Sequence, residues 1–183
     1  NPTDSGMEIT GQTASTLDGF DVTGGDYGVL VGNSASGSMD LNNLTLDGQG
    51  TAGVYYAKDI TGTLSGTVVN SAGAAFKYGP NTDADVAFNS VSIASNAIGI
   101  ETSGTGDISM TDVTMANTKD VVIKSAANVE FVEGTVSTST VEVTGAGKFT
   151  RMRQLDVTLT ADAAGVPGAS VTLLDASGAS SGN

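Results

Sequence analysis

Residues 86–100 read VAFNSVSIASNAIGI, and residues 108–123 read ISMTDVTMANTKDVVI. In both stretches, apolar residues alternate with small or polar ones in three short runs, and polar segments separate the runs. Alternation with a period of two is typical of strands that bury one face. Each stretch therefore predicts three short β-strands, with a polar corner (89–90 or 111–112) between the first two.

The same three-strand unit recurs along the chain with a period of about 22 or 23 residues. Stacking successive units buries a continuous core that one unit could not form alone. The sequence therefore predicts an all-β, single-stranded parallel β-helix (a solenoid) of about six coils, with three short strands in each. Three apolar series carry this prediction: Leu17, Leu41, Leu64, Phe88, Met110, Phe131 and Met152; then Phe20, Leu44, Val68, Val91, Val113, Val136 and Leu155; then Val31, Tyr56, Phe76, Ile100, Ile123 and Val143.

The composition agrees with an all-β chain. Hydrophobic residues make up 39% of the 183 residues, which is too many for a simple disordered chain. Val, Thr and Ser dominate and favour strands and turns, whereas strong helix formers are sparse. A β-sandwich would also space its strands regularly, but it has no reason to repeat one three-strand unit in constant order.

The 86–100 unit resembles the parallel β-helix repeats of pectin-lyase-like proteins, and the resemblance extends over about residues 7 to 150. It implies a right-handed helix. It implies little about function, because that fold carries lyases, hydrolases, adhesins and phage tailspikes alike.

After Lys148 the pattern changes, so we expect the β-helix to occupy residues 1–150. Residues 151–176 contain two strand-like runs around a turn-rich segment, and they resemble the start of a carboxypeptidase-regulatory-like or immunoglobulin-like domain. An irregular last coil that caps the column is the alternative. The Ser- and Gly-rich residues 177–183 predict a linker or disordered tail.

The sequence contains neither His nor Cys, so the commonest general base and the thiolate nucleophile are both missing. We therefore expect no enzyme. The alternative is a fragment of a polysaccharide lyase or glycosidase. Its site would use Lys77, Glu101, Lys124 and Glu142, which alternate in sign on what should be one outward row. Cross-coil ion pairs explain these four residues more simply.

Two ligand sites are candidates. Tyr55, Lys77 and Tyr78 could form a carbohydrate-stacking surface on a lateral face, although rings that fill or cover a wider part of the core are the preferred explanation. Asn81, Asp83 and Asp85 gather oxygen ligands that suit Ca²⁺, although a solvated turn explains them as well. No other cofactor is expected.

The net charge of -13, with only seven Lys and Arg, disfavours nucleic acid and anionic membrane surfaces as partners. No stretch is apolar enough to insert into a membrane. We expect a structural or adhesive module of a larger secreted or cell-surface microbial protein, with glycans or other surface proteins as partners. An S-layer or filament subunit is a further alternative.

Overall fold

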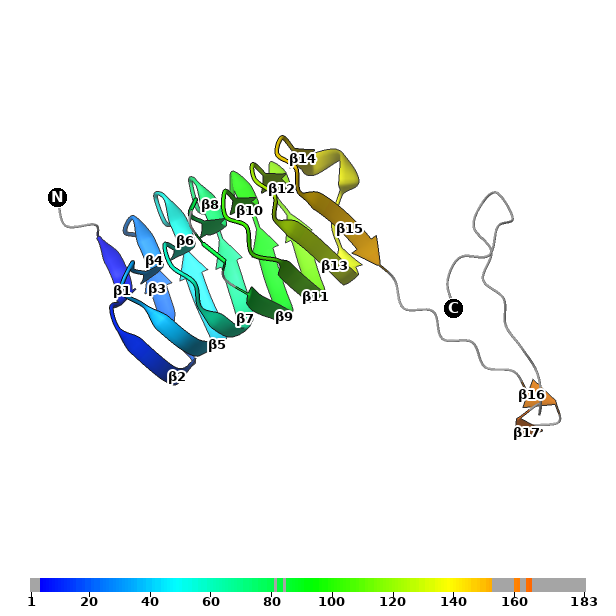
Figure 1. Cartoon of the computed structure of the whole chain (residues 1–183), viewed down its shortest axis with the longest axis horizontal. Coiled ribbons are helices and arrows are strands. Elements are labelled where there is room, and N and C mark those ends of the chain that lie inside the picture. Colours follow the sequence, from blue (N-terminus) through cyan, green and yellow to red (C-terminus); the bar gives the residue numbers. More distant parts are fainter. Residues whose placement is uncertain (1–3, 81, 84, 153–159, 162–163, 166–183) are drawn as a thin grey trace. The chain divides into compact units, whose positions relative to one another are not determined.

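The chain forms two compact units, Asn1–Arg153 and Gln154–Asn183. The computed structural model describes residues 4–80, 82–83, 85–152, 160–161 and 164–165. In the first unit, the strands stack as a parallel β-solenoid of about six turns (Figure 1). The predicted all-β solenoid is therefore confirmed.

Two parallel sheets run the length of the solenoid, here called sheet A and sheet B. Sheet A has seven strands, in spatial order β1 (Ser5–Ile9), β4 (Tyr27–Val31), β6 (Ala52–Tyr56), β8 (Ala74–Tyr78), β10 (Ile98–Thr102), β12 (Lys119–Ile123) and β14 (Val141–Val143). Sheet B contains β2 (Gln12–Asp18), β5 (Ser36–Asp47), β7 (Thr61–Val69), β9 (Asp85–Ala94), β11 (Ile108–Ala116), β13 (Asn128–Thr135) and β15 (Lys148–Met152), and β3 (Asp21–Thr23) also pairs with β5. A short 3₁₀ helix, Thr138–Thr140, precedes β14.

The first two predicted strands of each coil are separate only in the first coil, as β2 and β3. In β5, β9 and β11 they form one continuous strand that bends at its middle. The bend falls at the predicted polar corners, where Asn43, Ser90 and Asp112 have φ of 52°, 54° and 53°. Short polar residues tolerate this left-handed conformation better than most. The pairing between neighbouring strands therefore continues through the bend.

The first apolar series forms the core ladder that the sequence predicts. Leu41, Leu64, Phe88 and Met110 follow one another in register on β5, β7, β9 and β11, and all four are buried. For the last member of the series, the prediction was wrong. Arg151, not Met152, lies opposite Phe131, and Met152 is 38% exposed.

Each of the other two predicted series mixes residues that belong to two neighbouring rows of inward side chains. In sheet A, Phe76 is in register with Val54, whereas Tyr56 is in register with Tyr78. In sheet B, Gly66 occupies the position opposite Leu44 that the series gave to Val68. Only glycine fits there, because φ is 130° and an added Cβ would lie 2.2 Å from the Leu44 carbonyl oxygen.

Buried amides fill the turns that lead from sheet B to sheet A. Gln49 donates from Nε2 to the carbonyl oxygens of Val22, Gly24 and Asp47. Two and three coils later, Asn96 and Asn117 make equivalent contacts, and Asn96 Nδ2 donates to Asn117 Oδ1 at 2.9 Å. These side chains, the amide ladder, satisfy backbone groups inside the turns.

Asp120 ends the amide ladder. Its buried carboxylate accepts from the Asn117 backbone N–H and side-chain amide through Oδ1, at 3.0 and 3.1 Å. Through Oδ2 it accepts from the Ser137 N–H and the Thr140 hydroxyl, at 3.1 and 2.7 Å. The carboxylate thus fixes the 3₁₀ helix of the last coil to the coil before it.

The second unit contains a short antiparallel pair, β16 (Thr160–Ala161) and β17 (Ala164–Gly165). In the first unit, residues 151–152 still belong to β15, which pairs with β13. Most of the predicted segment 151–176 and all of the tail 177–183 lie outside the described residues. Whether 151–176 is a cap or the start of another domain stays a prediction.

Candidate functional site

The outer face of sheet A brings together most of the sequence-predicted site residues. Their backbones are in register across seven successive strands, so their side chains form one outward row along the solenoid. The row reads Glu8, Leu30, Tyr55, Lys77, Glu101, Val122 and Glu142. Tyr55 and Lys77 therefore lie side by side on neighbouring coils, as predicted.

A depression of about 380 Å³ lies at the N-terminal end of this row. Tyr27 and Tyr55 stack within it with ring centroids 5.5 Å apart and planes at 21°. The remaining lining residues come from two strands, β1 and β4, and from the loops after β4, β6 and β8: Glu8, Leu30, Gly32, Asn33, Ala57 and Pro80. The depression thus combines two aromatic rings, an aliphatic floor, a carboxylate and an amide.

The two phenols shape the chemistry of the depression. Partial burial, with smaller contributions from Tyr55 and Asp26, raises the pKa of Tyr27 above its usual value. The Tyr27 hydroxyl therefore stays protonated at neutral pH and can donate a hydrogen bond. The stacked rings cover each other's facing surfaces, so a ligand would meet their edges, hydroxyls and outer faces.

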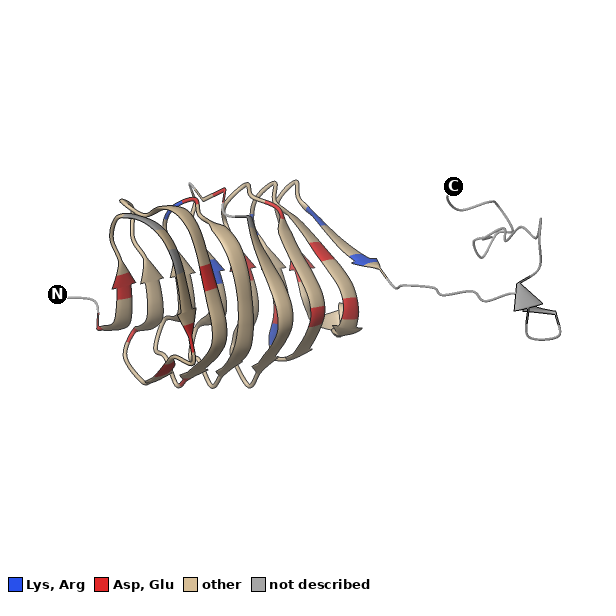
Figure 2. Cartoon of the chain, turned by 90° about the horizontal axis from the view of Figure 1, so that it is seen from below, with Lys and Arg blue, Asp and Glu red and all other residues tan. Residues whose placement is uncertain are grey.

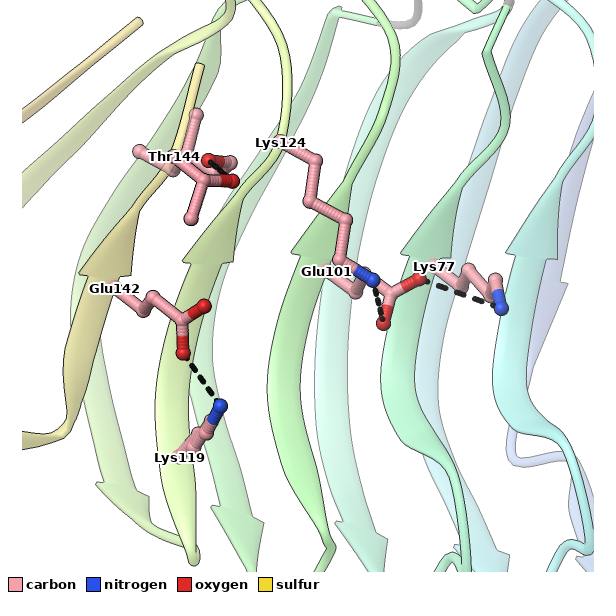
Figure 3. A network of polar contacts seen from close by, with 7 residues as sticks. Lys77, Glu101, Lys119, Lys124, Glu142 and Thr144 are labelled. Atoms are coloured by element: carbon pink, nitrogen blue, oxygen red, sulfur yellow. Dashed lines mark hydrogen bonds and ion pairs between the residues drawn. The ribbon is translucent and has the colours of Figure 1, made fainter.

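Lys77 does not line the depression, and it is held in an ion pair. Its Nζ lies 3.4 Å from Glu101 Oε1 on the next coil, and Lys124 Nζ lies 3.1 Å from Glu101 Oε2. Figure 3 shows Glu101 between the two lysines. The Glu101 side chain is only 10% exposed, against 36% and 47% for Lys77 and Lys124. The three residues form a compact ion-pair cluster.

The proposed outward row of Lys77, Glu101, Lys124 and Glu142 needs one correction. Lys124 follows the end of β12, and Val122 occupies its place in the row. Glu142 does not join the Glu101 cluster but pairs with Lys119 (Figure 3). The hydrogen bond from Lys119 and its charge lower the pKa of Glu142.

Tyr78 lies inside the solenoid. It is 2% exposed and stacks on Tyr56 with ring centroids 4.7 Å apart. Since Lys77 points outward, the next residue along the strand must point inward. Tyr78 therefore offers no surface to a carbohydrate, and the aromatic partner of Tyr55 at the surface is Tyr27.

The sequence-predicted Ca²⁺ loop is only partly described. Asn81 lies outside the described residues, and so does the side chain of Asp85. Asp83 is exposed, and its backbone N–H donates to Asp59 Oδ1 at 2.6 Å. Within the described part of the chain, no three His, Cys, Asp or Glu side chains are placed to hold a metal ion together.

A second depression, of about 360 Å³, lies on sheet B between β9, β11 and β13. Its polar residues are Asp107, Ser109 and Glu130. Asp107 Oδ1 is already occupied, because the backbone N–H and the side-chain amide of Asn128 donate to it at 3.2 and 3.0 Å. This depression lacks an aromatic ring, and we prefer the one on sheet A as the candidate site.

Sequence reasoning did not assign Glu8, Tyr27 or Asn33 to the candidate site. Glu8 and Tyr55 are 47 residues apart, and only the register of β1 on β4 and of β4 on β6 brings them together. The periodic spacing of apolar residues gives that register to within two residues. That precision is too low to assign a partner to an outward side chain.

No family model matches the chain, and neither a curated protein nor a solved structure is significantly similar to it. Among the helices of the described residues, none is long and apolar enough to span a membrane. The class that the geometry defines is the parallel β-solenoid, with a lateral depression lined by tyrosines.

Proposed function

We propose that the chain is a structural or adhesive module of a larger secreted or cell-surface microbial protein, and that it binds glycans on the outer face of sheet A. The observation that carries the proposal is the depression lined by the stacked rings of Tyr27 and Tyr55. Its volume of about 380 Å³ falls within the range of small-ligand sites, roughly 300–1,000 Å³.

The chemistry of the depression suits a sugar. A sugar ring presents C–H faces and hydroxyl edges, and tyrosine offers an apolar ring and a polar tip. The two tyrosines of the depression lie on β4 and β6, which are paired on both sides, so they are held rigidly and little conformational entropy is lost on binding. A rigid column with a lateral binding face is what an adhesive stalk requires.

The finer details of the fold belong to the same proposal. We take the solenoid to be a right-handed parallel β-helix of the pectin-lyase-like kind, with three sides per coil. The bends at Asn43, Ser90 and Asp112, which divide β5, β9 and β11 of sheet B into two, support the three-sided section. An experimentally determined structure tests this, and a left-handed trace would contradict it.

The acidic composition supports a secreted or surface location and disfavours nucleic acid and anionic membranes as partners. Expression of the full-length gene product, followed by fractionation of its host, tests the location. Recovery of the protein only from the cytoplasm would contradict it.

Glycan-array screening followed by calorimetry tests the ligand. The parent protein should bind at least one glycan, and Tyr55→Ala should weaken that binding tenfold or more, about 1.4 kcal/mol. The matched control is Thr114→Ala, an exposed substitution on sheet B, which should bind like the parent. A folded parent that binds no glycan would leave only the structural role.

The second candidate, a fragment of a polysaccharide lyase or glycosidase, draws on the Lys77–Glu101–Lys124 cluster. Both lysines are held in ion pairs in that cluster, which is not the state of a free catalytic base. Incubation with polyuronates and Ca²⁺, monitored by ultraviolet absorbance, should therefore give no unsaturated product. Product that disappears in Lys124→Ala would establish the enzyme instead.

A further inference from the structure

Most residues that line the depression on sheet A belong to a stretch of sequence whose charged residues are all acidic. Between residues 4 and 57 the sequence contains no Lys or Arg. Figure 2 shows acidic residues in the first coils and basic residues only further along. The acidic residues of this stretch are Asp4, Glu8, Asp18, Asp21, Asp26, Asp40 and Asp47.

Glu8 brings this charge into the depression. Its side chain is exposed and lines the depression, one coil away from Leu30 in the outward row and two from Tyr55. The ion pairs among the described residues involve Lys58, Lys77, Lys119 and Lys124, and none of them includes Glu8.

The nearest basic residue in register does not neutralise the depression. Lys77 is adjacent to Tyr55, but its ammonium is paired with the Glu101 carboxylate at 3.4 Å (Figure 3). Among the described residues that line it, the depression therefore presents a carboxylate and two electron-rich rings, and no Lys or Arg. Aromatic rings and carboxylates together attract ligand ammonium groups.

We propose that the depression binds the protonated amino group of an amino sugar within a glycan, and this rests on the function proposed above. Glu8 accepts the ammonium, the outer ring surfaces of Tyr27 and Tyr55 contact it or the sugar ring, and Asn33 with the two phenols meets the hydroxyls.

A glycan fits better than a basic peptide. Extended peptides usually bind by adding a strand to an exposed edge. Here β4 and β6, which carry the two tyrosines, are paired on both sides, and a strand could be added only along the edge strand β1, beyond Glu8 and not over the rings. Recognition in the depression must pass through side chains with polar tips, which is how sugars are bound.

A matched pair of ligands tests the proposal. Glucosamine oligomers and N-acetylglucosamine oligomers of equal length differ only in whether the amine is free to be charged. At slightly acidic pH, calorimetry should give tighter binding of the free-amine oligomer by about fivefold or more, and added salt should reduce that preference.

Variants locate the effect. Glu8→Gln should bring the two affinities together, because it removes the charge and keeps the shape. Glu133→Gln removes an exposed carboxylate from β13, far from the depression in the strand order, and should leave the preference unchanged. Tyr55→Phe retains the ring and should keep most of the preference, which guards against a Tyr55→Ala variant that fails to fold.

The outcomes separate the two proposals. Equal binding of both oligomers would overturn the proposal that the ligand is cationic and would leave glycan binding in place. If the protein bound neither oligomer and no other glycan, the proposed function itself would be overturned. A preference that survives Glu8→Gln would place the cation elsewhere. If the protein bound oligolysine through Glu8 but bound neither sugar, the ligand would be a basic peptide and the glycan proposal would be overturned.

Discussion

At the scale of single residues, Tyr56 and Tyr78 are the most costly feature of the core. Both are fully buried and stack at 4.7 Å, and within the described residues neither hydroxyl has a hydrogen-bond partner. A buried hydroxyl without a partner costs about 1–3 kcal/mol. The stacked rings recover part of that cost through burial and ring contact.

Burial raises the pKa of both phenols above the usual value of 10.0. A group whose pKa is raised in the folded state contributes stability that is fully present below its unfolded pKa. That stability is lost as pH rises toward the folded pKa. We therefore expect the free energy of unfolding to fall above about pH 10. Urea denaturation across this range measures it.

Tyr56→Phe and Tyr78→Phe provide the control. Each removes a buried hydroxyl and keeps the ring, so the change at neutral pH should be neutral or stabilising by up to about 1 kcal/mol. The double variant should lose much of the alkaline instability. An unchanged alkaline loss in the double variant would assign the effect to other groups.

At the scale of elements, the amide ladder determines how sheet B passes into sheet A. Asn96 is 2% exposed, and its Oδ1 accepts from the Ser71 N–H at 2.8 Å. Its Nδ2 donates to the carbonyl oxygens of Val68 and Ala94 at 3.1 and 3.0 Å. One side chain thus joins three successive turns.

Asn96→Asp should destabilise the solenoid by about 3 kcal/mol or more. The new carboxylate would be buried against carbonyl oxygens and would lose the two donors of the amide. Chemical denaturation gives the size of the effect. Asn89→Asp, on an exposed position of β9, is the matched control and should change stability by about 0.5 kcal/mol at most. Equal effects of the two variants would contradict a special role for the ladder.

At the scale of the whole solenoid, the sequence predicts the coils and the corners well. The period of the apolar residues follows directly from stacking, and the polar corners fall where the backbone adopts positive φ. The sequence does not choose between neighbouring inward ladders. Positions two residues apart on a strand face the same way, so Phe76 could be assigned beside Tyr56 although it lies beside Val54.

The same reasoning explains the outcome at the candidate site. Tyr55 and Lys77 are the immediate neighbours of the correctly assigned inward residues Tyr56 and Phe76, so their outward direction could be predicted. The same alternation predicts that Tyr78 points inward, because it lies two residues after the inward Phe76, and the carbohydrate surface that included Tyr78 did not follow it. The depression itself depends on how two ring side chains lean along the sheet, and spacing contains no information about that.

The parallel order of the strands has a mechanical consequence. Each coil is bonded only to the coil before it and the coil after it, and the strands lie across the long axis. Tension applied to the chain through its two ends would therefore open the ladder bonds in sequence, starting at an end, and would not shear them all at once. Each coil of about 23 residues would release roughly 80 Å of chain. Single-molecule pulling should show a series of small steps at low force, so that the solenoid would yield gradually under load, and one large rupture would contradict this.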